Sequence, residues 1–164
     1  MVFKGYTQIG EGTLILIRDY LEIGRYTRIG FLSFFMDSDD HFTVNMENQK
    51  VARNKAPIII GKYNWIANKT VIKKNTKIPD YTIVASSNTL LSKDYTENGE
   101  FCVLGGIPAK VIRFRFDQEQ IGALLKIRWW DWSPERIRTN IPYLSSADIS
   151  GFIHRTNAFQ NPVD

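Results

Sequence analysis

The sequence contains few of the residues that form disulfides, histidine-rich metal sites or membrane spans. Cys102 is the only cysteine among 164 residues, so no intrachain disulfide can form and nothing indicates an oxidising compartment. The two histidines, His41 and His154, are too few for a zinc centre with several histidine ligands, and we expect no metal. No apolar run approaches the ~20 residues of a membrane-spanning helix. Residues 1–10 lack the apolar region of a signal peptide, so we expect a cytoplasmic protein without stable membrane insertion.

The composition is that of a globular protein with a mild excess of positive charge. Hydrophobic residues make up 43% of the chain, which excludes a disordered polymer. The formal net charge is +4 and the sequence pI is about 9.2, values that suit an anionic ligand. No nucleic-acid-binding motif accompanies this charge, and we therefore expect no nucleic-acid partner.

Aliphatic residues recur every six positions in the middle of the chain. The unbroken series is Ile60, Ile66, Ile72, Ile78, Val84 and Leu90. A strand repeats every two residues and a helix about every 3.6, so neither element alone explains this period. A hexapeptide repeat is typical of a parallel β-helix. Three hexads per turn would stack residues 18 apart, namely Ile78 on Ile60, Val84 on Ile66 and Leu90 on Ile72.

A second column of small or short polar residues supports this interpretation. Four positions after successive aliphatic residues stand Asn64, Thr70, Thr76, Thr82 and Asn88. Such residues suit tight corners with little room. The six-residue period also occurs upstream, at Ile17, Ile23, Ile29 and Phe35. We therefore predict a mainly β fold, a parallel β-helix whose first coils occupy residues 5–35.

Two segments depart from the repeat. Residues 36–57 are polar and charged, and we expect a loop that protrudes from one corner, because insertions in repeat folds map to loops. Asp117 with Gln120 three residues later forms a capping-box pattern, and Ser133-Pro134 opens a second helix. Residues 145–164 give no clear periodic signal. We predict a β-helix domain over 1–112 with the loop 36–57, and a C-terminal helical extension and tail over 113–164.

Three short motifs resemble a known family. They are DSDDH at 37–41, IGKYNWI at 60–66 and GIPAKVI at 106–112. Together they are similar to motifs of the left-handed β-helix, hexapeptide-repeat acyltransferases, and the first is similar to the D-x-D-x-H loop of surface-polysaccharide O-acetyltransferases. Residues 114–137 resemble the C-terminal helix of xenobiotic acetyltransferases. The resemblance implies a left-handed parallel β-helix, a homotrimer, and acetyl-CoA as cosubstrate in the groove between neighbouring β-helices.

His41 is the candidate general base. Acetyl transfer from a thioester to a hydroxyl requires removal of the hydroxyl proton, which a neutral imidazole can accept. Asp39, Asp37 or Asp40 can hydrogen-bond the other ring nitrogen and fix the tautomer. We also assign Asp40 and Trp65 to the acceptor side of the site. A solvated loop histidine without a catalytic role is the alternative.

The candidate cofactor residues follow from stacking and from the resemblance. Asn68 and Ser86 are 18 residues apart, so their backbone N–H groups should form a ladder that suits the amides of a pantetheine arm. By resemblance, the cofactor positions are Asn68, Ser86, Ser92, Lys93 and Lys110, with Arg113 at the same basic end. The family's usual glycine is replaced by Ala67, Lys73 and Pro79 in successive coils, a departure that affects these contacts.

The residues favour an O-acetyltransferase that acts on a sugar hydroxyl of a polysaccharide or its precursor. Three alternatives stay open: a xenobiotic (antibiotic) O-acetyltransferase, an amino-sugar N-acetyltransferase, and a non-catalytic β-helix scaffold. The aromatic tail favours the first alternative, whereas the DSDDH loop favours a sugar acceptor.

Overall fold

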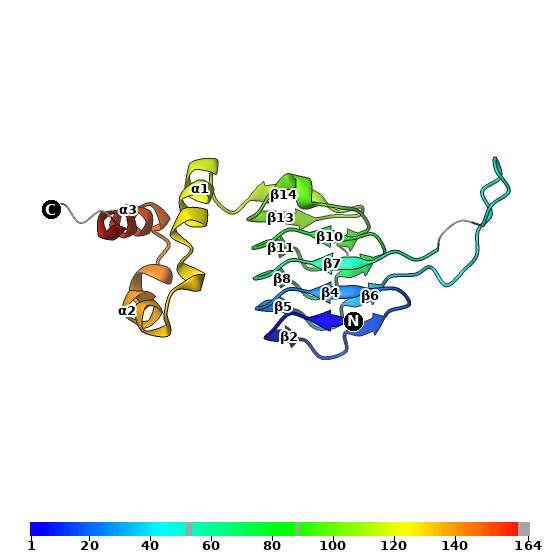
Figure 1. The fold of residues 1–164 in the computed structure, drawn as a ribbon, viewed down its shortest axis with the longest axis horizontal. Helices are drawn as coiled ribbons and strands as arrows, with labels where there is room; N and C mark the ends of the chain where they lie inside the picture. Colours follow the sequence, from blue (N-terminus) through cyan, green and yellow to red (C-terminus); the bar gives the residue numbers. More distant parts are fainter. Residues whose placement is uncertain (52–53, 88, 161–164) are drawn as a thin grey trace. The chain divides into compact units, whose positions relative to one another are not determined.

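The chain forms two compact units, Met1–Arg115 and Phe116–Asp164. A computed structural model describes residues 1–51, 54–87 and 89–160. The first unit is built of short strands that stack as successive coils (Figure 1).

Three sheets form the walls of the first unit. The first sheet contains β1 (Val2–Phe3), β4 (Leu21–Ile23), β7 (Ile58–Ile60) and β10 (Lys77–Ile78). The second contains β2 (Thr7–Ile9), β5 (Thr27–Ile29), β8 (Trp65–Ile66), β11 (Ile83–Val84), β13 (Cys102–Gly105) and β14 (Lys110–Phe114). The third contains β3 (Leu14–Leu16), β6 (Phe34–Met36), β9 (Val71–Lys73) and β12 (Leu90–Leu91). Neighbouring strands are parallel, except that β14 pairs antiparallel with β13.

Inward-facing aliphatic residues stack in columns, as the six-residue period predicts. Ile78 pairs with Ile60, and Val84 pairs with Ile66, which confirms both of these stacked pairs. All four side chains are buried. Because burying one such side chain stabilises a fold by roughly 1.5–3 kcal/mol, the columns supply the main driving force for coiling.

One predicted pair is wrong. Leu91, and not Leu90, lies opposite Ile72, and Leu91 is the side chain that is fully buried. The corner before β12 contains one more residue than the corner before β11, which moves the register by one and turns Leu90 outward. Since both residues are leucines, the period alone did not distinguish them.

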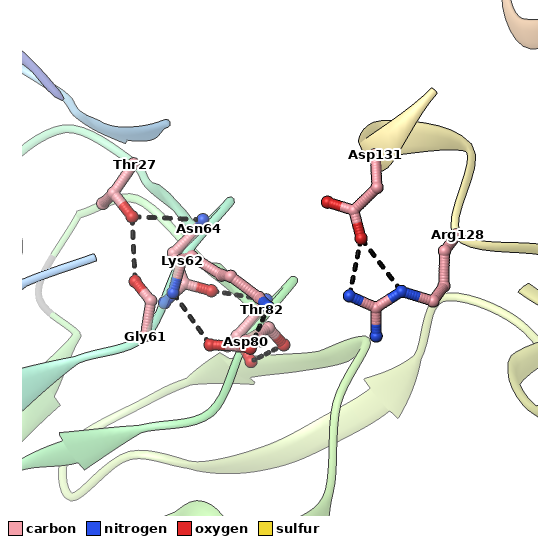
Figure 2. Close-up of polar contacts among 8 residues, drawn as sticks. All are labelled: Thr27, Gly61, Lys62, Asn64, Asp80, Thr82, Arg128 and Asp131. Carbon is pink, nitrogen blue, oxygen red and sulfur yellow. Dashed lines mark hydrogen bonds and ion pairs between the residues drawn. The ribbon is translucent and has the colours of Figure 1, made fainter. Parts of the chain in front are cut away.

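The predicted small polar residues fill the corners. Thr70 and Thr76 are buried, and each hydroxyl donates to the backbone carbonyl three residues earlier. Thr27 donates to the carbonyl of Gly61 at 2.9 Å, and Asn64 accepts from the backbone N–H of Thr82 at 2.7 Å (Figure 2). Asn88 lies outside the described residues.

A column of aromatic residues lines the corner between the first and second sheets. This aromatic ladder consists of Tyr6, Tyr26, Tyr63, Tyr81 and Phe101. Ring centroids in its upper steps lie 4.8 to 5.4 Å apart and the rings are stacked. The four residues from Tyr26 upward adopt the left-handed backbone conformation, which is costly for bulky residues and is therefore maintained by the coil geometry.

The second unit is helical. It contains α1 (Gln118–Ile127), η2 (Trp129–Asp131), α2 (Pro134–Leu144) and α3 (Ile149–Gln160). The short helix η1 (Thr96–Asn98) belongs to the first unit. The capping box of Asp117 with Gln120 is confirmed, as is the Ser133 cap of α2. After α1, Arg128 binds Asp131 through two N–H groups at 2.9 and 2.6 Å (Figure 2). None of the described helices is long and apolar enough to cross a bilayer.

The helix α3 was not predicted from the sequence. Its residues include Gly151, Thr156 and other weak helix formers, so the periodic signal is faint. The helix packs against α1, and Phe152 is buried there. Tertiary packing therefore supplies the stability that the local sequence lacks.

Candidate functional site

The segment that carries His41 leaves the β-helix after β6 and returns at β7. It therefore starts and ends at the corner between the third and first sheets, and it projects away from the coils (Figure 1). We refer to residues 37–57 as the catalytic loop, after the role that we propose for His41 below.

Asp37 ties the base of this loop to the coil below. Its carboxylate is fully buried and accepts the backbone N–H groups of Arg18 (2.7 Å), Asp19 (2.7 Å) and Tyr20 (2.9 Å). Three such bonds satisfy a buried carboxylate without a counter-ion. Through these bonds Asp37 holds the turn at 18–20. Among the described residues, Asp37 forms no hydrogen bond or ion pair with His41.

Asp39 attaches the loop to the next coil above. Its carboxylate forms ion pairs with Lys74 and, at 3.4 Å, with Lys73 at the end of β9. Lys74 also donates to the carbonyl of Asn54 on the returning part of the loop, at 3.3 Å. The hydrogen bond from Lys74 is the main reason that the pKa of Asp39 lies below its usual value, with a smaller contribution from Lys73.

Asp40 is the carboxylate adjacent to His41 in the chain. Arg18 donates to both carboxylate oxygens of Asp40, at 3.3 and 3.4 Å. The backbone N–H of Asp40 donates to the hydroxyl of Ser38. The bonds from Arg18 and Ser38 lower the pKa of Asp40, and the charge of His41 adds to this effect. An ionised carboxylate therefore lies within electrostatic reach of the imidazole.

The side chain of His41 is exposed and makes no hydrogen bond to any described residue. Its neighbours Asp39 and Asp40 are both engaged by basic side chains, which fix the backbone on the N-terminal side of the histidine. This combination gives a histidine on an anchored segment with its ring available to an incoming hydroxyl group.

The ladder predicted for Asn68 and Ser86 lies at a different corner, between the second and third sheets. The backbone N–H of Ser87 donates to the carbonyl of Asn68 at 3.0 Å, so the two turns stack directly. The side-chain oxygen of Asn68 accepts from the N–H of Phe31 in the coil below, at 3.2 Å. Within the part of the chain that is described, the backbone N–H groups of Asn68 and Ser86 have no acceptor and can therefore donate to a ligand.

Ser92 and Lys93 follow β12 at the same corner as the catalytic loop, and both are exposed. The ammonium of Lys93 lies 5.3 Å from the centre of the Tyr95 ring, a cation–π distance. Asp94 beside it pairs with Lys77 at 2.8 Å.

Lys110 and Arg113 lie on β14, where both are exposed. Arg113 pairs with Val103, which pairs with Ile83, which in turn pairs with Trp65. Trp65 is 57% exposed, so a large aromatic ring and a guanidinium lie on the outer face of the second sheet.

The predicted residues thus do not converge within one chain. His41, Ser92 and Lys93 lie at one corner, whereas Asn68 and Ser86 lie at another, and the third sheet separates the two corners. Sequence reasoning missed the role of Lys74 and Arg18 as anchors of the loop. The sequence contains one signal for such anchors, because Lys73 stands where the repeat usually has glycine, and its ammonium group pairs with Asp39.

Cys102 is an inert core residue. It is buried in β13 with its sulfur 3.4 Å from the hydroxyl of Thr82. Burial raises the pKa of its thiol, which keeps it neutral and unreactive. Among the described residues, no group of three or more His, Cys, Asp or Glu side chains is arranged to hold a metal ion.

Known proteins resemble this chain over most of its length, although no protein-family model matches it. A chloramphenicol acetyltransferase of Klebsiella aerogenes is 33% identical over 151 residues, which cover 92% of this chain and 69% of that protein. A chloramphenicol acetyltransferase of Escherichia coli is 29% identical over 156 residues, which cover 94% of this chain and 70% of that protein. A probable macrolide acetyltransferase of Lysinibacillus sphaericus is 35% identical over 92 residues, covering 56% and 49%.

Two solved structures share the fold. The polySia specific acetyltransferase NeuO is 24% identical with a TM-score of 0.60, and the match covers 70% of this chain and 54% of that one. The polysialic acid O-acetyltransferase OatWY is 23% identical with a TM-score of 0.57, covering 76% and 62%. The fold is the left-handed parallel β-helix. The chain belongs to the hexapeptide-repeat acetyltransferases of the chloramphenicol acetyltransferase type.

Proposed function

We propose that this protein transfers the acetyl group of acetyl-CoA to a hydroxyl group of a sugar, with His41 as the general base. The observation that carries the proposal is the exposed imidazole of His41, free of hydrogen bonds to the described residues, on a loop that Asp37 and Asp39 anchor to two different coils. A ring without other hydrogen bonds on an anchored backbone supports this role, because a general base must come within hydrogen-bond reach of the hydroxyl whose proton it accepts.

In the proposed step, the imidazole accepts the proton of the acceptor hydroxyl while its oxygen attacks the thioester carbonyl. A tetrahedral oxyanion forms, the carbon–sulfur bond breaks, and the departing thiolate takes the proton back from the imidazolium. The carboxylate of Asp40 precedes His41 directly in the chain, and the hydrogen bonds from Arg18 and Ser38 hold its pKa below the usual value. Asp39 and Asp37 act as positioning residues, because each binds a neighbouring coil.

The cofactor residues fall into two groups. The backbone N–H groups of Asn68 and Ser86 donate to amide carbonyls of the pantetheine arm. The phosphates lie toward the cationic side chains of Lys110 and Arg113 on β14. Ser92 and Lys93 lie at the corner of the catalytic loop and reach the phosphates from the neighbouring copy of the chain. Lysine and arginine both suit phosphate, lysine as a compact charge and arginine as a planar fork.

We infer that a complete site requires a neighbouring copy of the chain, in a homotrimer. The catalytic loop and the Asn68–Ser86 ladder lie at different corners of one β-helix, on either side of the third sheet. A groove between two copies allows the loop of one to meet the ladder of the other.

The acceptor that we favour is a carbohydrate, as in NeuO and OatWY, which act on polysialic acid. Trp65 offers an exposed ring for stacking on a sugar, and Asp40 offers carboxylate oxygens to hydroxyl groups. A xenobiotic acceptor is the second candidate. It is supported by the chloramphenicol and macrolide acetyltransferases among the relatives and by the exposed Phe42 and Met46 of the catalytic loop, which suit an apolar drug.

The test is a titration calorimetry experiment with acetyl-CoA, followed by an acceptor panel. Wild type should bind acetyl-CoA saturably, Lys110→Ala should bind it at least several-fold more weakly, and Lys126→Ala, an exposed lysine of α1, should bind like wild type. Absence of binding at millimolar acetyl-CoA would contradict the enzymatic proposal and favour a scaffold.

The panel contains sialic acid oligomers, maltose, an amino sugar, chloramphenicol and a macrolide, with release of free CoA as the readout. Turnover with the hydroxyl sugars but not with the drugs supports the favoured acceptor. Turnover only with the drugs replaces it with the xenobiotic candidate, and turnover only with the amino sugar indicates N-acetylation.

A further inference from the structure

A pocket of about 500 Å³ lies in the helical unit and is lined by side chains of α2 and α3. Its walls include Arg136 and Tyr143 of α2 and Arg155 of α3. Trp132, which precedes the cap residue of α2, also lines it. This volume falls within the range typical of small-ligand sites, which is roughly 300–1,000 Å³. We propose that this pocket binds a small molecule that carries a phosphate group, through Arg136 and Arg155.

Both guanidinium groups are held in place by aromatic rings. The central carbon of the Arg136 guanidinium lies 3.9 Å from the centre of the Trp132 ring, and that of Arg155 lies 4.1 Å from the centre of the Tyr143 ring. Stacking of this kind uses the flat face of the guanidinium and leaves its in-plane N–H donors available. The donors are therefore oriented before a ligand arrives, which reduces the entropy lost on binding.

Neither guanidinium has a partner that would use these donors. Within the described residues, Arg136 and Arg155 form no ion pair, and their guanidinium N–H groups donate to no acceptor. The described residues that line the pocket include no Asp or Glu. The nearby carboxylate of Asp131 is bound by Arg128 at 2.6 Å. Two cations that share a pocket without a counter-charge repel each other, and a bound anion removes this cost.

Three other polar side chains of the pocket already donate hydrogen bonds to acceptors in the protein. The side-chain amide nitrogen of Asn140 donates to the carbonyl of Arg136 at 2.8 Å, and the hydroxyl of Thr156 donates to the carbonyl of Phe152 at 2.7 Å. Thr139 likewise donates to backbone carbonyls of its own helix. Among the described residues that line the pocket, the donors left without an acceptor are the two guanidinium groups and the hydroxyl of Tyr143, and the two positive charges favour an anion over a neutral molecule.

The charge count favours phosphate over a single carboxylate. Two guanidinium groups match the two negative charges of a phosphomonoester or a diphosphate, and arginine binds such oxygens through parallel N–H bonds. The phosphate can belong to coenzyme A itself or to a separate phosphorylated compound. The two sources share this chemistry and are separated by experiment.

The test is calorimetric titration of inorganic pyrophosphate into the 164-residue chain. Wild type should bind it saturably, and Arg136→Gln and Arg155→Gln should each weaken the affinity at least tenfold, with circular dichroism used to confirm the helix content. Arg138→Gln is the matched control, because Arg138 is an exposed arginine of the same helix that does not line the pocket.

Three results would overturn the proposal: no saturable binding by wild type, equal binding by wild type and both pocket variants, or loss of binding only in Lys110→Ala. The last result would assign pyrophosphate to the β-helix unit. With binding by the pocket established, a repeat in saturating coenzyme A identifies the source. Loss of pyrophosphate binding shows that the phosphates of coenzyme A occupy the pocket, and unchanged binding shows that a separate compound does.

Discussion

The buried carboxylate of Asp37 accepts a hydrogen bond from the backbone N–H of Tyr20, which lies 17 residues earlier in the chain and 2.9 Å away. Together with the bonds from Arg18 and Asp19, this contact fastens the start of the catalytic loop to the coil below. The loop therefore moves with the β-helix at its base, and its anchoring can be tested separately from its chemistry.

Replacement of Asp37 should destabilise the β-helix. Asp37→Ala leaves three partly buried N–H groups without an acceptor, and we expect a loss of about 3 kcal/mol in the free energy of unfolding. Asp37→Asn keeps one acceptor oxygen and should lose less. Chemical denaturation of both variants measures the difference, and an unfolding midpoint unchanged in Asp37→Ala would show that these bonds carry no net stability.

The ion pairs of Asp39 should matter for turnover more than for folding. Lys74→Ala removes the bond from Lys74 to Asp39 and a contact with Asn54, which loosens the segment that holds His41. Because a misplacement of about 1 Å can cost about 10²-fold in rate, we expect kcat to fall roughly tenfold or more while acetyl-CoA affinity changes little. Lys50→Ala, which changes a loop lysine whose side chain has no partner among the described residues, is the control. Equal kcat values in Lys74→Ala and wild type would remove the positioning role.

The ion pair of Asp94 with Lys77 should make the free energy of unfolding depend on pH under acidic conditions. A hydrogen bond from Lys77, together with bonds from Thr96, lowers the pKa of Asp94 to about 2. A carboxyl whose pKa is lower in the folded state stabilises the fold above its unfolded pKa of about 3.9, and this contribution is lost as the pH falls toward 2. Asp94→Asn should therefore show a smaller loss of stability between about pH 4 and pH 2 than wild type. NMR titration of the Asp94 carboxyl carbon measures its pKa directly, and a midpoint near 3.9 would contradict the assignment.

The aromatic ladder should contribute more at its middle than at its end. Tyr63 stacks between Tyr26 at 5.0 Å and Tyr81 at 5.4 Å, whereas Tyr6 contacts one ring at 6.3 Å in a tilted arrangement. Because each aromatic pair adds roughly 0.5–1.5 kcal/mol beyond area burial, Tyr63→Leu should cost about 1–3 kcal/mol. Tyr6→Leu should cost clearly less. Thermal unfolding of the two variants gives the comparison, and equal losses would mean that stacking is not the source of stability.

The inward columns could be predicted because they depend on side-chain pattern alone. Ile60, Ile66, Ile78 and Val84 follow the six-residue period, and each is buried where that period requires it. The period failed at Leu90, where a corner of one extra residue moved the register and two adjacent leucines hid the change. Corner length is a backbone property that the aliphatic pattern does not record.

The candidate site could be predicted only in its individual residues. Contacts such as Asp39 with Lys74 join positions 35 residues apart, and they depend on how many residues each coil takes up. The helix α3 was missed for a similar reason, since its packing on α1 comes from tertiary structure and not from local periodicity. The site that we propose brings the catalytic loop to the Asn68–Ser86 ladder of a second chain, and a single sequence does not describe contacts between chains.

The most direct test of the proposed chemistry compares the two histidines. The rate of CoA release, measured at saturating acetyl-CoA with the best acceptor of the panel, should fall by about 10²–10⁴-fold in His41→Ala. The same variant should still bind acetyl-CoA and keep the oligomeric state of wild type. His154→Ala, which changes an exposed histidine of α3, should retain the wild-type rate. A His41→Ala protein that acetylates as fast as wild type would contradict the assignment of His41 as the general base.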